Sequence, residues 1–180
     1  LRDKAFANMK AKYASWEEVA HADIEELKDV LRLAGMSSTK PPRIQQILAA
    51  VKEKFGDYTL RSLRGLSQPE VREYLTSLPG VGSKTSAIVE CFDLGLPGFP
   101  VDTHITRLSK RFGWADEKEP PDKIQARLEA SLPPERFRGG HLNLLEHGRG
   151  ICNARKPRCS ECTLRKWCKA PESADGADGL

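Results

Sequence analysis

Apolar residues recur in this sequence at intervals of three and four, and this helical period constrains the fold more than any other feature. In residues 43–56 the apolar positions that share one helix face are Ile44, Ile47, Leu48, Val51 and Phe55. Residues 23–35 repeat the pattern, with Asp23 placed to cap the helix N-terminus and Gly35 placed to end the helix. The strict alternation that is typical of strands is nearly absent. We therefore predict an all-α fold.

Further helical stretches follow from the same period, and the chain between them carries turn signals. The stretches are 68–78, 83 to 92, Asp102 to Arg111, 121–131 and 136–149. Pro79 to Gly82 interrupt the period between the first two stretches, which predicts a helix, a tight glycine turn and a second helix. Residues 170–180, which repeat Ala-Asp-Gly, are predicted to be a disordered tail.

The size and composition are those of one water-soluble domain with room for a small appended lobe. Of the 180 residues, 39% are hydrophobic and 30% are charged, and no apolar run approaches the roughly 20 residues that span a bilayer. We expect no membrane segment and no secretion signal, and we expect a monomer. Because the first residue is Leu1 and not Met, we also expect the sequence to be a fragment or a processed form.

The distribution of charge says more than the net charge of +4. Between Arg149 and Lys169 there are seven Lys or Arg residues and a single acid, Glu161. This local positive patch favours a polyanionic partner such as DNA. A solvated basic face is the alternative interpretation.

Four of the five cysteines fall within seventeen residues, which is unlike the layout of a disulfide framework. Their spacing is C-x6-C-x2-C-x5-C, from Cys152 through Cys159 and Cys162 to Cys168. Such spacing suits thiolates that converge on one metal centre in a reducing compartment, and it leaves both an iron–sulfur cluster and a tetrahedral zinc ion open. Cys91, inside an apolar helical pattern, is expected to be a buried small hydrophobe.

The glycine turn "LPGVGSKT", residues 78–85, suits phosphate binding. Gly80 and Gly82 remove the Cβ atoms that would hold a ligand away, and the following helix points its free N–H groups into the same space. A plain helix connection is the alternative. Lys84 stands in the first helical turn, where the helix dipole disfavours a cation by a few tenths of a kcal/mol to about 1 kcal/mol. This mismatch favours a functional role for Lys84.

The order of motifs along the chain resembles the endonuclease III family, helix-hairpin-helix DNA glycosylases with an iron–sulfur cluster. The motifs are "LPGVGSKT", "VDTHITRL" at 101–108, "HGRGIC" at 147–152, and the four cysteines. The resemblance implies a two-lobed fold with a C-terminal cluster loop. One lobe would comprise residues 17–131 and contain the hairpin at 68–96. Residues 1–16 with 132–169 would form the cluster lobe, with the active cleft between the two.

The resemblance also implies the chemistry. Lys84 matches the nucleophile that displaces a damaged base from C1′ of its sugar and forms a Schiff base, and Asp102 matches the second catalytic group. The Schiff base makes β-elimination at the 3′ phosphate feasible, so the expected enzyme removes oxidised pyrimidines from duplex DNA and cleaves the abasic site. For Asp102, a plain helix N-cap is the alternative role.

The remaining site residues follow from the same resemblance. Cys152, Cys159, Cys162 and Cys168 match the ligands of a 4Fe–4S cluster, with zinc as the less favoured alternative. Residues expected to contact DNA are Gly80, Val81, Gly82 and Ser83 in the hairpin, and Arg155, Lys156 and Arg158 in the cluster loop. Met36 is the expected wedge that fills the space left by the extruded base. Packing of Met36 onto the core is the alternative.

Other functions stay open at this point. A mismatch or adenine glycosylase without lyase activity is one, and a non-catalytic helix-hairpin-helix DNA-binding module is another. In this resemblance the match begins just after an upstream segment that relatives carry, and Ser83 and Ala87 differ from the residues common at those positions. In a bacterium we expect the protein in the cytoplasm, associated with the nucleoid.

Overall fold

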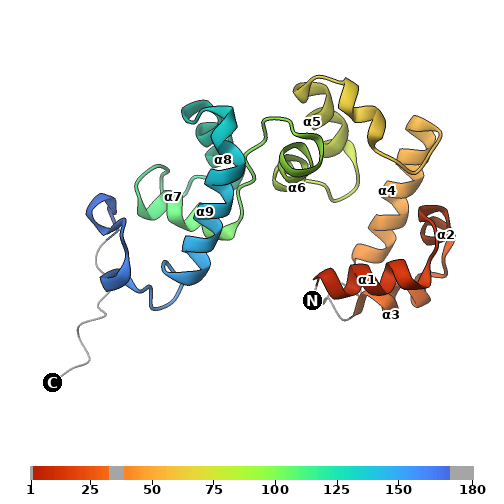
Figure 1. Ribbon diagram of the computed structural model, residues 1–180, viewed down its shortest axis with the longest axis horizontal. Helices are drawn as coiled ribbons and strands as arrows, with labels where there is room; N and C mark the ends of the chain where they lie inside the picture. Colours follow the sequence, from red (N-terminus) through yellow and green to blue (C-terminus); the bar gives the residue numbers. More distant parts are fainter. Residues whose placement is uncertain (1, 33–38, 171–180) are drawn as a thin grey trace. The chain divides into compact units, whose positions relative to one another are not determined.

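The computed structural model describes residues 2–32 and 39–170 (Figure 1). Its α-helices are α1 (Arg2–Lys12), α2 (Trp16–His21), α3 (Ile24–Arg32), α4 (Lys40–Phe55), α5 (Gln68–Ser77), α6 (Ser83–Ile88), α7 (Thr103–Arg111), α8 (Pro121–Ser131) and α9 (Phe137–Gly150). These two ranges contain no β-strand, so the all-α prediction is confirmed. Met36, the predicted wedge, and residues 171–180 of the predicted tail lie outside the described residues.

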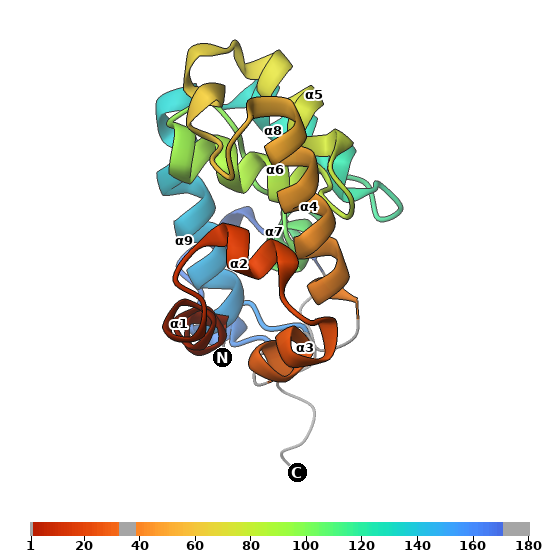
Figure 2. The ribbon, with the colours of Figure 1, turned by 90° about the vertical axis from the view of Figure 1, so that its right-hand side faces the viewer.

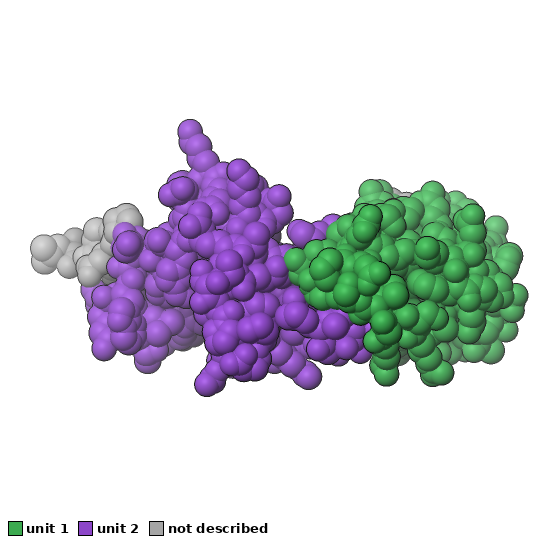
Figure 3. Space-filling view, turned by 90° about the horizontal axis from the view of Figure 1, so that it is seen from above, with its two compact units in different colours: residues 1–81 green, residues 82–180 purple. Residues whose placement is uncertain are grey.

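The chain divides into two compact units, residues 1–81 and residues 82–180 (Figure 3). The boundary falls inside the glycine turn between α5 and α6. The lobes implied by the family resemblance have different boundaries and stay a prediction. None of the described helices combines the length and the apolar character that crossing a bilayer requires.

In the first unit, α1 packs on α3, and α2 packs on α4 (Figures 1 and 2). The core between them is formed by Ala5, Met9, Tyr13, Val19, Leu27, Leu31 and Leu48. The side-chain amide of Gln45 in α4 donates to the backbone carbonyls of Val19 at 3.2 Å and Ala22 at 2.8 Å. These bonds satisfy carbonyls at the end of α2, where the helix itself offers no partner.

Two helix ends predicted in this unit are formed as expected, whereas Gly35, the predicted end of the 23–35 stretch, lies outside the described residues. Asp23 accepts the backbone N–H groups of Glu25 and Glu26 at 2.9 and 3.0 Å, so α3 begins at the expected cap. Gly56 closes α4 in a left-handed conformation with φ of 73°.

In the second unit, α7 packs against both α8 and α9. The core consists of Phe99, Val101, Ile105, Ile124, Leu128 and Phe137. Gly148 allows α9 to approach α7 closely, because a Cβ atom built there would lie 2.8 Å from the Cβ of His104. The close approach brings the segment that follows α9, which carries the four cysteines, next to α7.

The second helix of the hairpin is longer than α6 alone. It continues as a π-helix, Val89–Leu94, and ends at Gly95, whose φ is 69°. The fully buried Glu90 accepts a hydrogen bond from the hydroxyl of Ser86 at 2.6 Å. The predicted stretch 83 to 92 is therefore helical, but its last turn is wider than the 3.6-residue period implies.

Candidate functional site

The glycine turn places its two glycines in different environments. Gly80 has φ of 74°, and a Cβ atom there would lie 2.8 Å from Cδ of Arg43 in α4. The positive φ favours glycine at this position, and any larger residue would also displace the flexible end of the Arg43 side chain. The N–H of Val81 donates to the carbonyl of Leu78 at 3.1 Å and so closes the turn.

Neither the backbone conformation nor the neighbouring atoms require glycine at position 82. It caps α6 in an extended conformation, with φ of −101°, and a Cβ atom built there would meet nothing within 4 Å. The backbone N–H groups of Gly82 and Ser83 have no hydrogen-bond partner among the described residues. The surface beside them is thus open to a ligand that accepts hydrogen bonds, as the sequence predicts for a phosphate.

Lys84 and Asp102, the two predicted catalytic residues, line the same hollow of about 660 Å³ within the second unit. Lys84 is the second residue of α6, and its side chain is exposed. Asp102 is half-buried and caps α7, where its Oδ1 accepts the N–H of Ile105 at 2.9 Å. In the part of the chain that the structure describes, the Lys84 ammonium forms no ion pair. A cation without a fixed partner therefore shares one site with a carboxylate.

One face of α7 forms much of this hollow. The residues that line it there are Thr103, Thr106, Arg107, Lys110 and Arg111. Val101 before α7, Glu117 between α7 and α8, and Pro121 at the start of α8 also line it. None of the five α7 residues was among the predicted site residues. Counted from Thr103, the other four follow at three, four, seven and eight residues, which is the spacing of one helix face, but the spacing does not indicate that this face borders the hollow.

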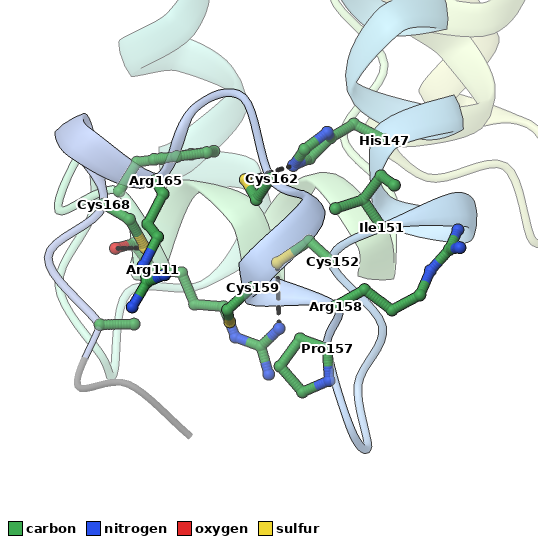
Figure 4. A pocket seen from close by; sticks show the side chains of 12 residues that line it. Arg111, His147, Ile151, Cys152, Pro157, Arg158, Cys159, Cys162, Arg165 and Cys168 are labelled. Carbon is green, nitrogen blue, oxygen red and sulfur yellow. Dashed lines mark hydrogen bonds between the residues drawn. The ribbon is translucent and has the colours of Figure 1, made fainter. Parts of the chain in front are cut away.

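The four predicted cysteine ligands line a second cavity of about 350 Å³ (Figure 4). Nη1 of Arg111 donates to Sγ of Cys152 at 3.0 Å, and Nε2 of His147 lies 3.6 Å from Sγ of Cys162. Burial lowers the pKa of His147, which favours the neutral imidazole. Donors directed at sulfur stabilise the thiolate form that metal ligands require.

The cysteine cavity is consistent with a 4Fe–4S cluster. Such a cluster gives each of four thiolates its own iron, and the four cysteines lie around one cavity. Zinc, which needs its sulfur ligands at about 2.3 Å from one point, stays the alternative.

Two arginines of α7 join the hollow lined by Lys84 and Asp102 to the segment that carries the four cysteines. Nη2 of Arg107 donates to the carbonyls of Gly148 at 2.7 Å and Cys152 at 2.8 Å. Nη1 of Arg111 donates to the carbonyl of Asn153 at 2.8 Å in addition to its contact with sulfur. Arg111 lines both cavities, so it lies at the junction between them.

The three basic residues predicted to face DNA differ in their environments. Arg155 and Lys156 are exposed, and Lys156 adopts a φ of 50°, which is uncommon outside glycine. Arg158 is engaged within the chain, because its Nε donates to the carbonyl of Gly150 at 3.0 Å and its Nη1 pairs with Glu161 at 2.9 Å. Arg158 thus holds the loop, while Arg155 and Lys156 project from it.

Comparison with known proteins places the chain in a family. Residues 3–134 match the family described as HhH-GPD superfamily base excision DNA repair protein. Endonuclease III of Thermotoga maritima is 34% identical over 93% of this chain and 74% of its own length. For endonuclease III of Bacillus subtilis the identity is 32%, over 91% of this chain and 71% of that protein.

A solved structure described as a trapped endonuclease III–DNA covalent intermediate superimposes with a TM-score of 0.80 and 29% identity, over 92% of this chain and 74% of the other. The fold, the order of the motifs and the sequence similarity agree. The chain belongs to the HhH-GPD superfamily of base excision DNA repair proteins and is endonuclease III-like.

Proposed function

We propose that this protein is a bifunctional DNA glycosylase and abasic-site lyase that acts on oxidised pyrimidines in duplex DNA. The observation that carries the proposal is the shared hollow of Lys84 and Asp102. Lys84 supplies an amine without a fixed partner, and Asp102 supplies a carboxylate held in place by its bond to the N–H of Ile105. An amine and a carboxylate at one sugar suffice for both steps of the reaction.

In the first step the Lys84 amine attacks C1′ of the extruded nucleotide, and the C1′–N bond to the base breaks. The base leaves with a proton, and the sugar ring opens as the Schiff base forms. Asp102 stabilises the positive charge that develops on the sugar. In the second step a proton leaves C2′ and the C3′–O bond breaks, which releases the 3′ phosphate. Water then hydrolyses the imine and frees Lys84.

Two further features support binding to damaged DNA. The open surface beside Gly82 and Ser83 offers backbone N–H donors for a phosphate. Arg155 and Lys156 project from the cysteine segment, where they would contribute affinity and salt dependence rather than sequence recognition. Relatives with solved structures bind DNA: one is a trapped covalent intermediate and another a non-covalent complex of endonuclease III.

We propose that Cys152, Cys159, Cys162 and Cys168 hold a 4Fe–4S cluster. When bound, the cluster would cross-link the segment 152–168 and so fix the basic loop between its first two ligands. Arg111 would donate to one of the sulfurs, as it does in this structure.

The proposed reaction is tested by trapping with borohydride on duplex DNA that carries one abasic site. We expect a covalent protein–DNA product from the parent chain and none from Lys84→Ala. Lys118→Ala is the matched control, because Lys118 is an exposed lysine of the second unit that does not line the hollow. A product of equal yield from Lys84→Ala would assign the nucleophile to another amine, and no product from the parent would contradict the lyase step.

A further inference from the structure

The hollow that contains Lys84 and Asp102 is richer in cations than the reaction requires. Its charged lining consists of Lys84, Arg107, Lys110 and Arg111 with Asp102 and Glu117. The two arginines donate hydrogen bonds to backbone carbonyls of α9 and of the cysteine segment. Lys84 has the chemical role proposed above. Lys110 therefore remains as a cation of the site without an assigned role.

Lys110 is half-buried, and its Nζ donates to the backbone carbonyl of Glu117. An ammonium group carries three N–H donors, so this bond leaves two of them available. No carboxylate pairs with Lys110 in the ranges 2–32 and 39–170. A cation with free N–H donors and no carboxylate partner can bind a negatively charged ligand without first breaking an ion pair.

The same face of α7 carries a second polar group whose hydrogen bonds are not all formed. Thr106 lies four residues before Lys110 and also lines the hollow. Its hydroxyl is buried and has no hydrogen-bond partner within the described part of the chain. Buried polar groups in native proteins are normally satisfied, so an orphan in the lining indicates that a polar ligand or water completes the site.

The position of Lys110 on α7 restricts what it can reach. It follows Asp102 by eight residues, which places its Cα about 12 Å further along the helix axis at a rise of about 1.5 Å per residue. Lys110 and Asp102 nevertheless line the same hollow, so both residues border one space. At this offset Lys110 is beyond the sugar beside Asp102 but within reach of neighbouring nucleotides, which recur about every 3.4 Å along a strand.

We propose that Lys110 binds a backbone phosphate of the damaged strand, within about three nucleotides of the extruded one. The inference rests on the proposed function and adds a substrate contact to it. Lys110 would hold the strand while Lys84 and Asp102 act on the sugar. The bond from Lys110 to the carbonyl of Glu117 joins two residues that line the same hollow.

The contact is tested by binding to a duplex that contains a tetrahydrofuran abasic analogue, which cannot form a Schiff base. Lys110→Met keeps the aliphatic stem and removes the charge, and Lys118→Met is the matched control on the adjacent loop. We expect Lys110→Met to bind about tenfold more weakly, with the slope of log K against log salt reduced by about 0.9. The control should change affinity less than twofold, and Lys110→Arg should retain most of the affinity because it retains the charge.

Phosphate scanning separates a direct contact from a structural role in holding the loop. Each of the three phosphates on either side of the abasic analogue is replaced in turn by an uncharged methylphosphonate. At one position we expect the replacement to weaken the parent about tenfold and to leave Lys110→Met unaffected. Additive losses at all six positions, or equal losses from Lys110→Met and Lys118→Met, would overturn the contact. A parent that binds abasic and undamaged duplexes equally would instead contradict the proposed function.

Discussion

The guanidinium of Arg111, the last residue of α7, donates to Sγ of Cys152 at 3.0 Å. The backbone carbonyl of Arg111 also accepts the N–H groups of Lys169 and Ala170, each at 2.9 Å. One residue thus bonds to both ends of the cysteine segment. Because Asp102 caps the other end of the same helix, α7 carries the proposed catalytic carboxylate and the main contacts to the cysteine segment on one rigid element.

Removing the Arg111 side chain should loosen the cysteine segment. Arg111→Ala leaves the carbonyl of Asn153 and the sulfur of Cys152 without their donor, a loss of about 2 kcal/mol in the free energy of unfolding. We expect a lower melting temperature and less iron and acid-labile sulfide per chain. Arg155→Ala is the control for these two measurements, because Arg155 is exposed in the same loop. Equal iron content and equal melting temperatures in the two variants would show that the Arg111 contacts are dispensable.

Substitutions at the two glycines of the hairpin turn should affect different properties: at Gly80 the stability of the fold, and at Gly82 the binding of DNA. Gly80→Ala meets a positive φ and the side chain of Arg43, so we expect it to reduce the free energy of unfolding by about 1–2 kcal/mol. At Gly82 the φ is negative and a Cβ atom would contact nothing, and threonine is about as favourable as glycine at a helix N-cap. The free energy of unfolding of Gly82→Thr should therefore change by less than about 0.5 kcal/mol. Urea denaturation gives both values.

The same Gly82→Thr variant should bind DNA more weakly, because the added side chain occupies the space beside the free N–H groups of Gly82 and Ser83. The measurement is the dissociation constant for a duplex with an abasic analogue at fixed salt. Unchanged DNA affinity in a stable Gly82→Thr protein would show that the turn does not contact DNA.

The helices with a clear apolar stripe were predictable from the sequence, and those with a short stripe were not. The predicted stretch 121–131 coincides with α8, and Asp102 to Arg111 coincides with α7 and its cap. In contrast, α1 was not predicted: among its residues 3–12, whose burial the structure describes, only Ala5 and Met9 are buried, and two positions do not establish a period. Tertiary packing determines such helices more than their own pattern does.

The site was predictable where a residue carries its own local signal. Lys84 in an unfavourable place at a helix start and the spacing of the four cysteines are such signals. Lys110 and Arg111 carry none, because a basic residue near the end of a helix is favoured by the helix dipole alone. Their roles depend on which face of α7 borders the hollow, and that is fixed only by the packing of α8 and α9.

The start of α5 should respond to acid. Glu70 accepts hydrogen bonds from the hydroxyl of Ser67 at 2.5 Å and its N–H at 2.8 Å, and these bonds lower the pKa of Glu70 below its ordinary value of 4.5. A carboxylate whose pKa is lower in the folded state stabilises the fold at pH values above its unfolded-state pKa. This contribution is lost as the pH falls through the folded-state pKa. We expect Glu70→Gln to be less stable than the parent at pH 7.

The stability difference between the parent and Glu70→Gln should shrink as the pH falls below 4.5. Urea midpoints measured over a series of pH values test this, with Glu73→Gln on the exposed side of the same helix as the control. A difference that stays constant down to the lowest pH would mean that the charge of Glu70 has no part in the cap.

The two roles of Asp102 can be separated by substitution, because a cap needs an oxygen acceptor and the proposed chemistry needs a charge. Asp102→Asn keeps an acceptor for the N–H of Ile105, so the free energy of unfolding should stay within about 0.5 kcal/mol of the parent. Base excision should nevertheless slow by about a hundredfold or more, because the amide cannot stabilise positive charge on the sugar. Asp102→Ala should lose the activity together with about 1 kcal/mol of stability. An Asp102→Asn protein that excises damaged bases at the parental rate would leave Asp102 as a helix cap alone, and the proposed chemistry would then have to rely on Lys84 without a carboxylate.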